Sequence, residues 1–314
     1  MKKLLKLIFI VIFISTVILT GCSKEPEKTK MTIISTSFPG YDFSRAIIKD
    51  NDNIEVKMLL KPGAEMHDFE PTPQDIKNIR NSDIFIYVGG DSDTWIEGIL
   101  QDINKDKTKV IKLMDLVDLV EEDIVEGMEN HEDDEEEREY DEHVWTSPIN
   151  AIEITNKLKE HIIKLDKDNA ELYEKNAEDY INQLKDIDSE IMNIVENGKR
   201  KEIIFGDRFP IRYFADEYGL TYYAAFPGCS EQTEASSKTI SFLINKVKED
   251  KIPVVFQIEL SNGKIAKAIA KETGTKVLQY STAHNISQKD FDAGVTYADI
   301  MKNNIEVLKE ALNS

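Results

Sequence analysis

The sequence contains very little cysteine and lacks several features that would define a function. Only two of its 314 residues are cysteines, Cys22 and Cys229, so it has no disulfide framework. Lysine and arginine are outnumbered, 39 against 59 aspartates and glutamates, which gives a net charge of −20. Such a surface repels nucleic acid, which excludes a nucleic-acid-binding function. No His-Glu-x-x-His stretch is present, which excludes the common zinc-protease motif.

A signal-like hydrophobic run opens the chain. After a basic start, the apolar stretch from Leu7 to Leu19 has signal-peptide length and is short for a membrane span. The following Thr20-Gly21-Cys22 resembles the end of a bacterial lipobox, with Cys22 as the acylated residue. We expect residues 1–21 to be a lipoprotein signal peptide and residues 22–30 to be a flexible tether to the cell membrane. Removing residues 1–21 leaves 36 basic and 59 acidic residues, a net charge of −23.

Strands and helices alternate on both sides of a long segment that has neither glycine nor proline. Residues 31–148 predict a first lobe, with strands at 31–37, 54–60, 84–88 and 110–113. Residues 199–314 predict a second lobe, with strands at 202–205, 220–225, 253–257 and 276–280. Residues 149–198 predict one long connecting helix that Leu165–Lys167 can interrupt. The predicted fold class is therefore α/β, with two mostly parallel sheets flanked by helices and a cleft between the lobes.

An acidic run ends on a histidine. From Glu132 to Glu142, nine of eleven residues are aspartate or glutamate, within a loop expected at 130–142. His131 precedes the run and His143 follows it. Carboxylates favour hard cations without selecting among them. We therefore expect the loop to concentrate cations and His143 to be a site residue. For His131 two interpretations stay open: it binds a second, weaker cation, or it has no function.

Two more histidines fall at expected strand ends. His67 follows the second strand and His284 follows the last one. Because ligands of open α/β sheets bind at the carboxyl ends of the strands, we expect these imidazoles to meet His143 in the cleft. Imidazole is a good zinc ligand, and its second nitrogen usually donates to a carboxylate or carbonyl. Carboxylates suited to that role are Asp68, Asp141 and Glu142.

Several stretches resemble the metal-binding solute-binding proteins of ABC transporters. Gly63–Asp75 (GAEMHDFEPTPQD) resembles the first metal-ligand motif of that family, and Asp141–Pro148 (DEHVWTSP) resembles the second. Tyr213 with Tyr218-Gly219-Leu220 resembles the helix that follows the third ligand, and the acidic loop is similar to that of the zinc-specific branch. The resemblance implies two Rossmann-like lobes joined by one rigid helix, a metal ion in the cleft, and delivery of that ion to a permease.

The resemblance breaks at the third ligand position, which falls on Arg208. Arginine stays protonated and cannot bind a metal ion. Either Asp207 supplies the carboxylate instead, or Arg208 pairs with an acidic residue and that ligand is lost. The fourth position falls near Ser281, where His284 can substitute. The expected ligands are therefore His67, His143, His284 and Asp207. Glu234 and Glu259 are reserve ligands, although each is expected to pack or cap instead.

The expected ligand set predicts binding rather than catalysis. Three imidazoles and one carboxylate fill a tetrahedral zinc site, with bonds of about 2.0–2.2 Å, and leave no position for an activated water. We expect a monomeric, extracytoplasmic, lipid-anchored protein that binds Zn²⁺ and hands it to an ABC permease. Mn²⁺ is the alternative if two carboxylates share the site with two histidines. Two other classes stay open: a metallohydrolase with Glu65 or Glu142 as general base, and an adhesion or sensor protein with a structural metal.

Overall fold

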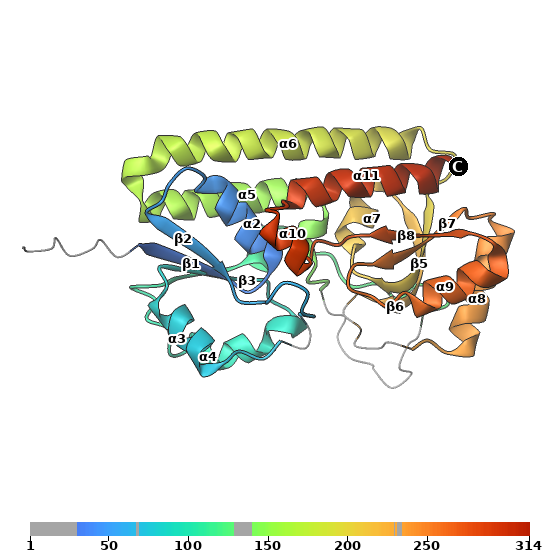
Figure 1. Ribbon diagram of the computed structural model, residues 1–314, viewed down its shortest axis with the longest axis horizontal. Coiled ribbons are helices and arrows are strands. Elements are labelled where there is room, and N and C mark those ends of the chain that lie inside the picture. The colour runs from blue at the N-terminus through green and yellow to red at the C-terminus, as the bar shows by residue number, and fades with distance from the viewer. Residues whose placement is uncertain (1–29, 67–68, 129–139, 229, 231–233) are drawn as a thin grey trace, which may run out of the picture.

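Two α/β lobes lie side by side beneath a shared layer of helices (Figure 1). The structure is a computed structural model that describes residues 30–66, 69–128, 140–228, 230 and 234–314. The expected signal peptide and tether, most of the acidic loop and four residues named above lie outside this part: His67, Asp68, His131 and Cys229. Within it, no helix is both long and apolar enough to cross a membrane.

The first lobe contains a parallel sheet with the strand order β2-β1-β3-β4. Its strands are β1 (Met31–Ser35), β2 (Ile54–Met58), β3 (Ile84–Tyr87) and β4 (Lys109–Lys112). Its helices are α2 (Phe38–Ile47), α3 (Pro73–Asn81) and α4 (Glu97–Leu100). α3 begins at Pro73 because Thr72 and Asp75 form a reciprocal capping box around its first turn.

The second lobe repeats this topology with the order β6-β5-β7-β8, again parallel. Its strands are β5 (Glu202–Phe209), β6 (Thr221–Pro227), β7 (Val254–Ile258) and β8 (Lys276–Tyr280). Its helices are α7 (Arg212–Tyr218), α8 (Ser237–Glu249), α9 (Lys264–Thr273), α10 (Gln288–Asp292) and α11 (Tyr297–Asn313). All eight expected strands, and with them the α/β fold of two parallel sheets, are confirmed.

One strand differs from the prediction in a way that matters for the site. β5 continues to Phe209 instead of ending at Phe205, and its register against β6 shifts between Phe205 and Arg208. Such an irregularity re-aims the side chains that follow it. Asp207 and Arg208 therefore belong to the end of a strand rather than to a loop.

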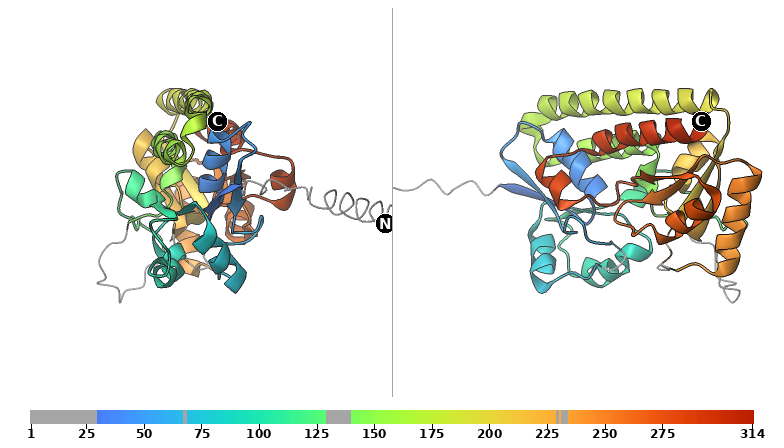
Figure 2. Two further views of the ribbon diagram at one scale, coloured as in Figure 1. Left: turned by 90° about the vertical axis from the view of Figure 1, so that its left-hand side faces the viewer. Right: turned by 45° about the vertical axis from the view of Figure 1, so that its right-hand side comes forward.

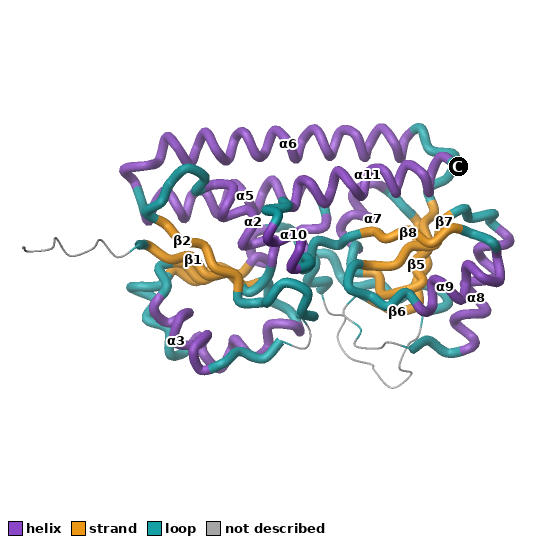
Figure 3. The backbone as a smooth tube through the Cα atoms, in the orientation of Figure 1, coloured by secondary structure: helices purple, strands orange, loops and turns teal. Residues whose placement is uncertain are grey.

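The segment expected as one long helix is a hairpin of two helices. α5 runs from Pro148 to Leu165, and the side chain of Ser147 caps its first turn. It ends at the interruption predicted at Leu165–Lys167. α6 (Ala170–Glu196) then returns over 27 residues and runs across both lobes. Figure 2 shows α6 on the outside of the helix layer, above α5, and Figure 3 shows its unbroken course. The long helix that connects the lobes is thus α6.

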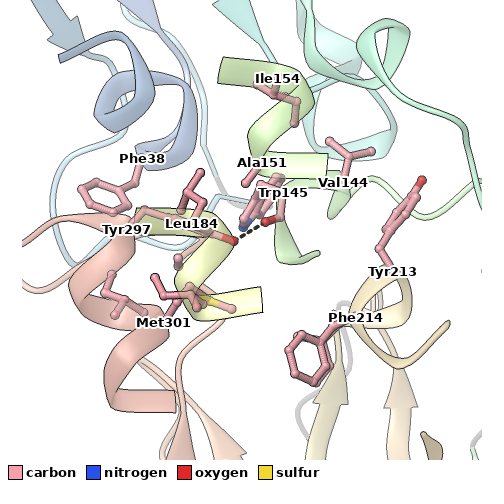
Figure 4. Packing of buried hydrophobic residues seen from close by; sticks show 14 of the residues in the cluster. Phe38, Val144, Trp145, Ala151, Ile154, Leu184, Tyr213, Phe214, Tyr297 and Met301 are labelled. Atoms are coloured by element: carbon pink, nitrogen blue, oxygen red, sulfur yellow. Dashed lines mark hydrogen bonds between the residues drawn. The ribbon is translucent and has the colours of Figure 1, made fainter. Parts of the chain in front are cut away.

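A continuous apolar core joins the lobes. Trp145, Phe214 and Tyr297 are fully buried in one cluster that includes residues from both sheets and from the hairpin. Figure 4 shows Trp145 between α5 and Tyr297, whose hydroxyl donates to the Trp145 carbonyl at 2.7 Å. Burying apolar surface stabilises by about 25 cal/mol per Å². Because this core crosses from one lobe to the other, the lobes are packed as one body.

A buried carboxylate also ties the lobes to α6. Asp42 on α2 accepts hydrogen bonds from the Tyr180 hydroxyl on α6 at 3.0 Å and from the backbone nitrogen of Tyr297 at 2.8 Å. Its other oxygen pairs with Arg45, which also donates to the Val295 carbonyl. Burial raises the pKa of Asp42, and Arg45 with the two tyrosine donors opposes that rise. This group of hydrogen bonds joins α2, α6 and the start of α11.

Candidate metal centre

His143 is held in place by the aspartate that precedes it by two residues. The side chain of His143 is fully buried, on the loop between the sheet of the first lobe and α5. Asp141 Oδ1 lies 3.0 Å from His143 Nδ1 and accepts the His143 backbone N–H at 2.7 Å. A carboxylate on one ring nitrogen fixes the tautomer and leaves the other nitrogen, Nε2, as the basic one. This is the arrangement expected of a metal-binding imidazole.

The charge around His143 favours a cation. Burial, the largest single influence, lowers the pKa of His143, but the charge and hydrogen bond of Asp141, together with Glu142, outweigh it and raise the pKa. Asp141 is itself anchored at both backbone ends, since its nitrogen donates to Val120 and its carbonyl accepts from the Tyr213 hydroxyl on α7. The second lobe therefore helps to orient a histidine of the first.

Glu142 does not take the orienting role that the sequence left open for it. Its carboxylate turns toward the first lobe, where it accepts from both the backbone and the hydroxyl of Ser92. Gly90, with φ +77°, makes room for it, because a Cβ there would lie 2.6 Å from Glu142 Oε2. Glu142 fixes the loop to Ser92, in the segment that follows β3, while Asp141 contacts the ring nitrogen of His143.

His284 approaches from the second lobe, on the loop after β8. Glu259, at the end of β7, accepts the backbone N–H of His284 at 3.2 Å. The same carboxylate accepts the backbone N–H and the hydroxyl of Thr282 at 2.7 and 2.6 Å. Burial raises the pKa of Glu259, and these hydrogen bonds oppose the rise. Glu259 therefore supports the loop that carries His284.

The structure brings His143 and His284 together. Their ring centroids lie 5.4 Å apart, and the ring of Trp145 lies 5.5 Å from each of them. The Trp145 indole donates to the Thr282 carbonyl at 2.8 Å, two residues before His284. Trp145 thus sets the spacing between a histidine of each lobe. Local sequence does not indicate this role, although Trp145 stands within the motif that contains His143.

Arg208 pairs with Glu65 across the lobes, as one of the two alternatives left open for it requires. Arg208 Nη2 lies 2.9 Å from Glu65 Oε2. Arg208 also donates to the Ser230 carbonyl at 3.4 Å. Arg208, at the expected third ligand position, therefore forms an ion pair with a carboxylate. Glu65 belongs to the loop that leads to His67.

Asp207 keeps one oxygen available inside the protein. Its Oδ1 accepts the Arg208 backbone N–H at 3.0 Å, while Oδ2 is buried without a hydrogen-bond partner in the described part of the chain. Burial raises the pKa of Asp207, against a hydrogen bond from Ser261. A small cavity of about 10 Å³ lies beside His284. Among the described residues, its lining includes Arg208, Glu65 and Thr282 but not Asp207.

The described residues contain part of the expected site. No group of three or more histidine, cysteine, aspartate or glutamate side chains within residues 30–66, 69–128, 140–228, 230 and 234–314 is arranged to hold a metal ion. His67, the third expected imidazole, lies outside these residues. The structure thus brings together His143 and His284, with Asp141 and Glu259 behind them.

Comparison with known proteins decides the family. The family described as "ZnuA: Zinc-uptake complex component A periplasmic" matches residues 33–311. The chain belongs to this family. ZnuA proteins are metal-binding solute-binding proteins and not enzymes, which sets the metallohydrolase alternative aside.

Individual ZnuA-family members are similar over most of the chain. The high-affinity zinc uptake system protein ZnuA of Bacillus subtilis (strain 168) is 33% identical, over 93% of this chain and 91% of that protein. The zinc-binding lipoprotein AdcA of Streptococcus pneumoniae is 29% identical over 93% of this chain, which spans 58% of AdcA. The crystal structure of the Zn(II)-bound ZnuA-like domain of that AdcA is 27% identical and superposes with a TM-score of 0.74, over 91% of this chain and 100% of the domain.

Proposed function

We propose that this ZnuA-family chain is an extracytoplasmic lipoprotein that binds Zn²⁺ between its lobes and delivers it to an ABC permease. The observation that supports it is the pair of buried imidazoles, His143 and His284, 5.4 Å apart. An ion held about 2.0–2.1 Å from a nitrogen of each ring fits between rings at this separation. Imidazole-rich sites favour zinc over manganese, for which carboxylate and carbonyl oxygen are better suited.

The proposed ligands are His67, His143, His284 and Asp207. Two features of the described residues support the set. Asp141 gives His143 the carboxylate partner that metal-binding imidazoles usually have. Asp207 has a buried carboxylate oxygen to offer, and binding a cation there would offset the burial that disfavours its charged form.

The proposed setting follows from the sequence and the family. Lipidation at Cys22 would anchor a monomer to the outer face of the cell membrane by residues 22–30, where an uptake permease collects its ion. The family description names a zinc-uptake complex. A core that joins the lobes through Trp145 and Tyr297 suits a protein that keeps its shape when empty.

Equilibrium titration with Zn²⁺ and Mn²⁺ tests the proposed function. The wild-type protein is expected to bind one Zn²⁺ ion per chain. It is expected to bind Zn²⁺ more tightly than Mn²⁺. His143→Ala and His284→Ala are each expected to weaken zinc binding by more than the roughly 10–100-fold that loss of an outer-shell partner costs. Asp207→Asn, which keeps the shape of the side chain, is expected to weaken binding as well.

The matched control is His161→Ala, because His161 lies within α5. Its zinc affinity should equal that of wild type. If Mn²⁺ binds more tightly than Zn²⁺, manganese is the transported ion in place of zinc. Unfolding of the protein on metal removal would instead indicate a structural metal, as in an adhesion or sensor protein. Unchanged binding in Asp207→Asn would remove Asp207 from the ligand set.

A further inference from the structure

The loop Lys61–Met66 of the first lobe is fastened to the second lobe at its base. The Asn285 side-chain amide donates to the carbonyls of Lys61 and Ala64, both at 2.8 Å. The backbone N–H of Gly63 donates to the Ile286 carbonyl at 2.7 Å. Asn285 is only 2% exposed, so these hydrogen bonds are shielded from water. The base of the loop is therefore a fixed attachment.

The tip of the same loop is attached in a different way. There the contact is the ion pair between Glu65 and Arg208, whose side chains are 33% and 17% exposed. Ion pairs that reach solvent contribute little to stability, so they open readily. Glu65 Oε1 accepts the backbone N–H of Met66, which couples the carboxylate to the backbone at the tip of the loop. The loop thus has a fixed base and a tip that can open.

The ion pair stands at the wall of the cavity beside His284. Glu65, Met66, Arg208 and His284 all line that cavity, which has a volume of about 10 Å³. This volume is about that of one water molecule. A hydrated divalent cation carries several waters and is larger than a cavity of this volume. Entry and release therefore require a part of the lining to move.

We propose that Arg208 and Glu65 form a latch that closes the cleft over a bound divalent cation and opens to admit or release it. Arg208 cannot bind the ion, since it stays protonated. Its charge is neutralised by Glu65 when the latch is closed. Arg208, at the position expected to supply a ligand, is instead the positively charged partner in the latch. This inference rests on the proposed function, because it concerns the exchange of the ion that the site binds.

The latch is tested by the rates of zinc binding and release, measured by stopped-flow transfer of Zn²⁺ to a chelator. Arg208→Gln and Glu65→Gln each remove the ion pair. Each is expected to raise the release rate by about two- to fivefold, the factor that corresponds to an ion pair of this exposure. The binding rate should rise too, so the dissociation constant should change less than the release rate.

A double-mutant cycle separates a latch from two independent effects. The variant carrying both substitutions should release zinc no faster than either single variant, because each one already breaks the same pair. Arg208→Lys, which keeps the charge, should release zinc at a rate closer to wild type. The control is Arg80→Gln, which breaks an ion pair with Asp102 on the surface of the first lobe and should leave both rates unchanged.

Three results would overturn the latch. Additive effects of Arg208→Gln and Glu65→Gln would show that the residues act separately. Lowered thermal stability with unchanged rates would show a purely structural ion pair. A faster binding rate in Arg208→Gln with an unchanged release rate would show simple repulsion of the cation by Arg208. In all three cases wild type still binds zinc, whereas a wild type that binds neither zinc nor manganese overturns the proposed function together with the latch.

Discussion

The rings of His143 and His284 meet at an interplanar angle of 88°, with their centroids 5.4 Å apart, although they belong to loops of different lobes. A buried carboxylate stands behind each loop. Asp141 contacts the ring nitrogen of His143, whereas Glu259 accepts the backbone N–H of His284. One carboxylate therefore sets the tautomer of a ring and the other sets the path of a loop. Both keep the imidazoles at the cleft before any ion arrives.

Trp145 should matter to stability and to the site through one hydrogen bond. Trp145→Phe removes the indole N–H and leaves the buried Thr282 carbonyl without its donor. A buried acceptor left in this way costs about 1–3 kcal/mol, and we expect a loss of unfolding free energy of that size. Zinc affinity should fall as well, because the indole fixes the segment that leads to His284. Denaturant unfolding followed by circular dichroism measures the first effect, and zinc titration measures the second.

The second tryptophan provides the matched control. Trp95 packs on Phe69, and its indole nitrogen has no hydrogen-bond partner within the described residues. Trp95→Phe therefore sacrifices no hydrogen bond that the structure shows, and zinc affinity should stay at the wild-type value. Equal losses of zinc affinity in the two variants would contradict the role assigned to Trp145.

Much of the fold could be predicted from sequence, because the signals are local. The strands appear as short apolar runs, and the absence of glycine and proline before Gly198 marks the helical hairpin. The sequence could not predict that Asp141 contacts the ring of His143 while Glu142 bonds to Ser92, since adjacent carboxylates look alike in sequence. This difference depends on Ser92 and Gly90, which approach Glu142 only after β3 and the loop have packed together.

The approach of His284 to His143 was expected only from topology and family resemblance. Strand ends of two sheets face one cleft, but the distance between two loops depends on what lies between them. Here Trp145 lies beside the pair, and its ring contacts both histidines. The partner of Arg208 was also beyond local reasoning, because Glu65 reaches it from the other lobe. Such contacts arise from packing between distant segments rather than from propensity.

Asp93 should make the stability of the metal-free protein depend on pH. Burial raises its pKa from 3.8 to about 7, with the backbone N–H groups of Val88 and Gly89 opposing and Glu142 assisting the rise. Between these values the folded protein holds a proton that the unfolded chain has lost. Stability contributed by this group is therefore full below about pH 4 and falls as the pH rises toward 7.

Asp93→Asn removes this titration while keeping an acceptor for Val88 and Gly89. The variant should gain stability relative to wild type as the pH rises from 4 to 7, measured by urea unfolding at a series of pH values without metal. The advantage should be smallest at pH 4, where wild-type Asp93 is itself protonated for the most part. A constant difference between the two proteins over this range would contradict the raised pKa.

Asp42 should be one of the most sensitive positions outside the metal centre, because three elements depend on it. Asp42→Ala leaves the Tyr180 hydroxyl and the Tyr297 N–H without their acceptor and removes the partner of Arg45. Breaking a buried charged contact of this kind costs about 3–5 kcal/mol of unfolding free energy. The matched control is Asp179→Ala on α6, since the exposed pair of Asp179 with Lys175 should change stability by about 0.5 kcal/mol or less.

The effect of Asp42→Ala should extend to the metal centre. Asp42 holds the first residue of α11, Tyr297, whose hydroxyl donates to the carbonyl of Trp145. A loosened Tyr297 therefore releases the tryptophan that spaces His143 from His284, and zinc affinity should fall although Asp42 touches neither ring. Asp42→Asn retains an acceptor oxygen and should show a smaller loss of both stability and affinity. Unchanged zinc affinity in a destabilised Asp42→Ala variant would separate the two roles and show that the helix junction does not position the histidines.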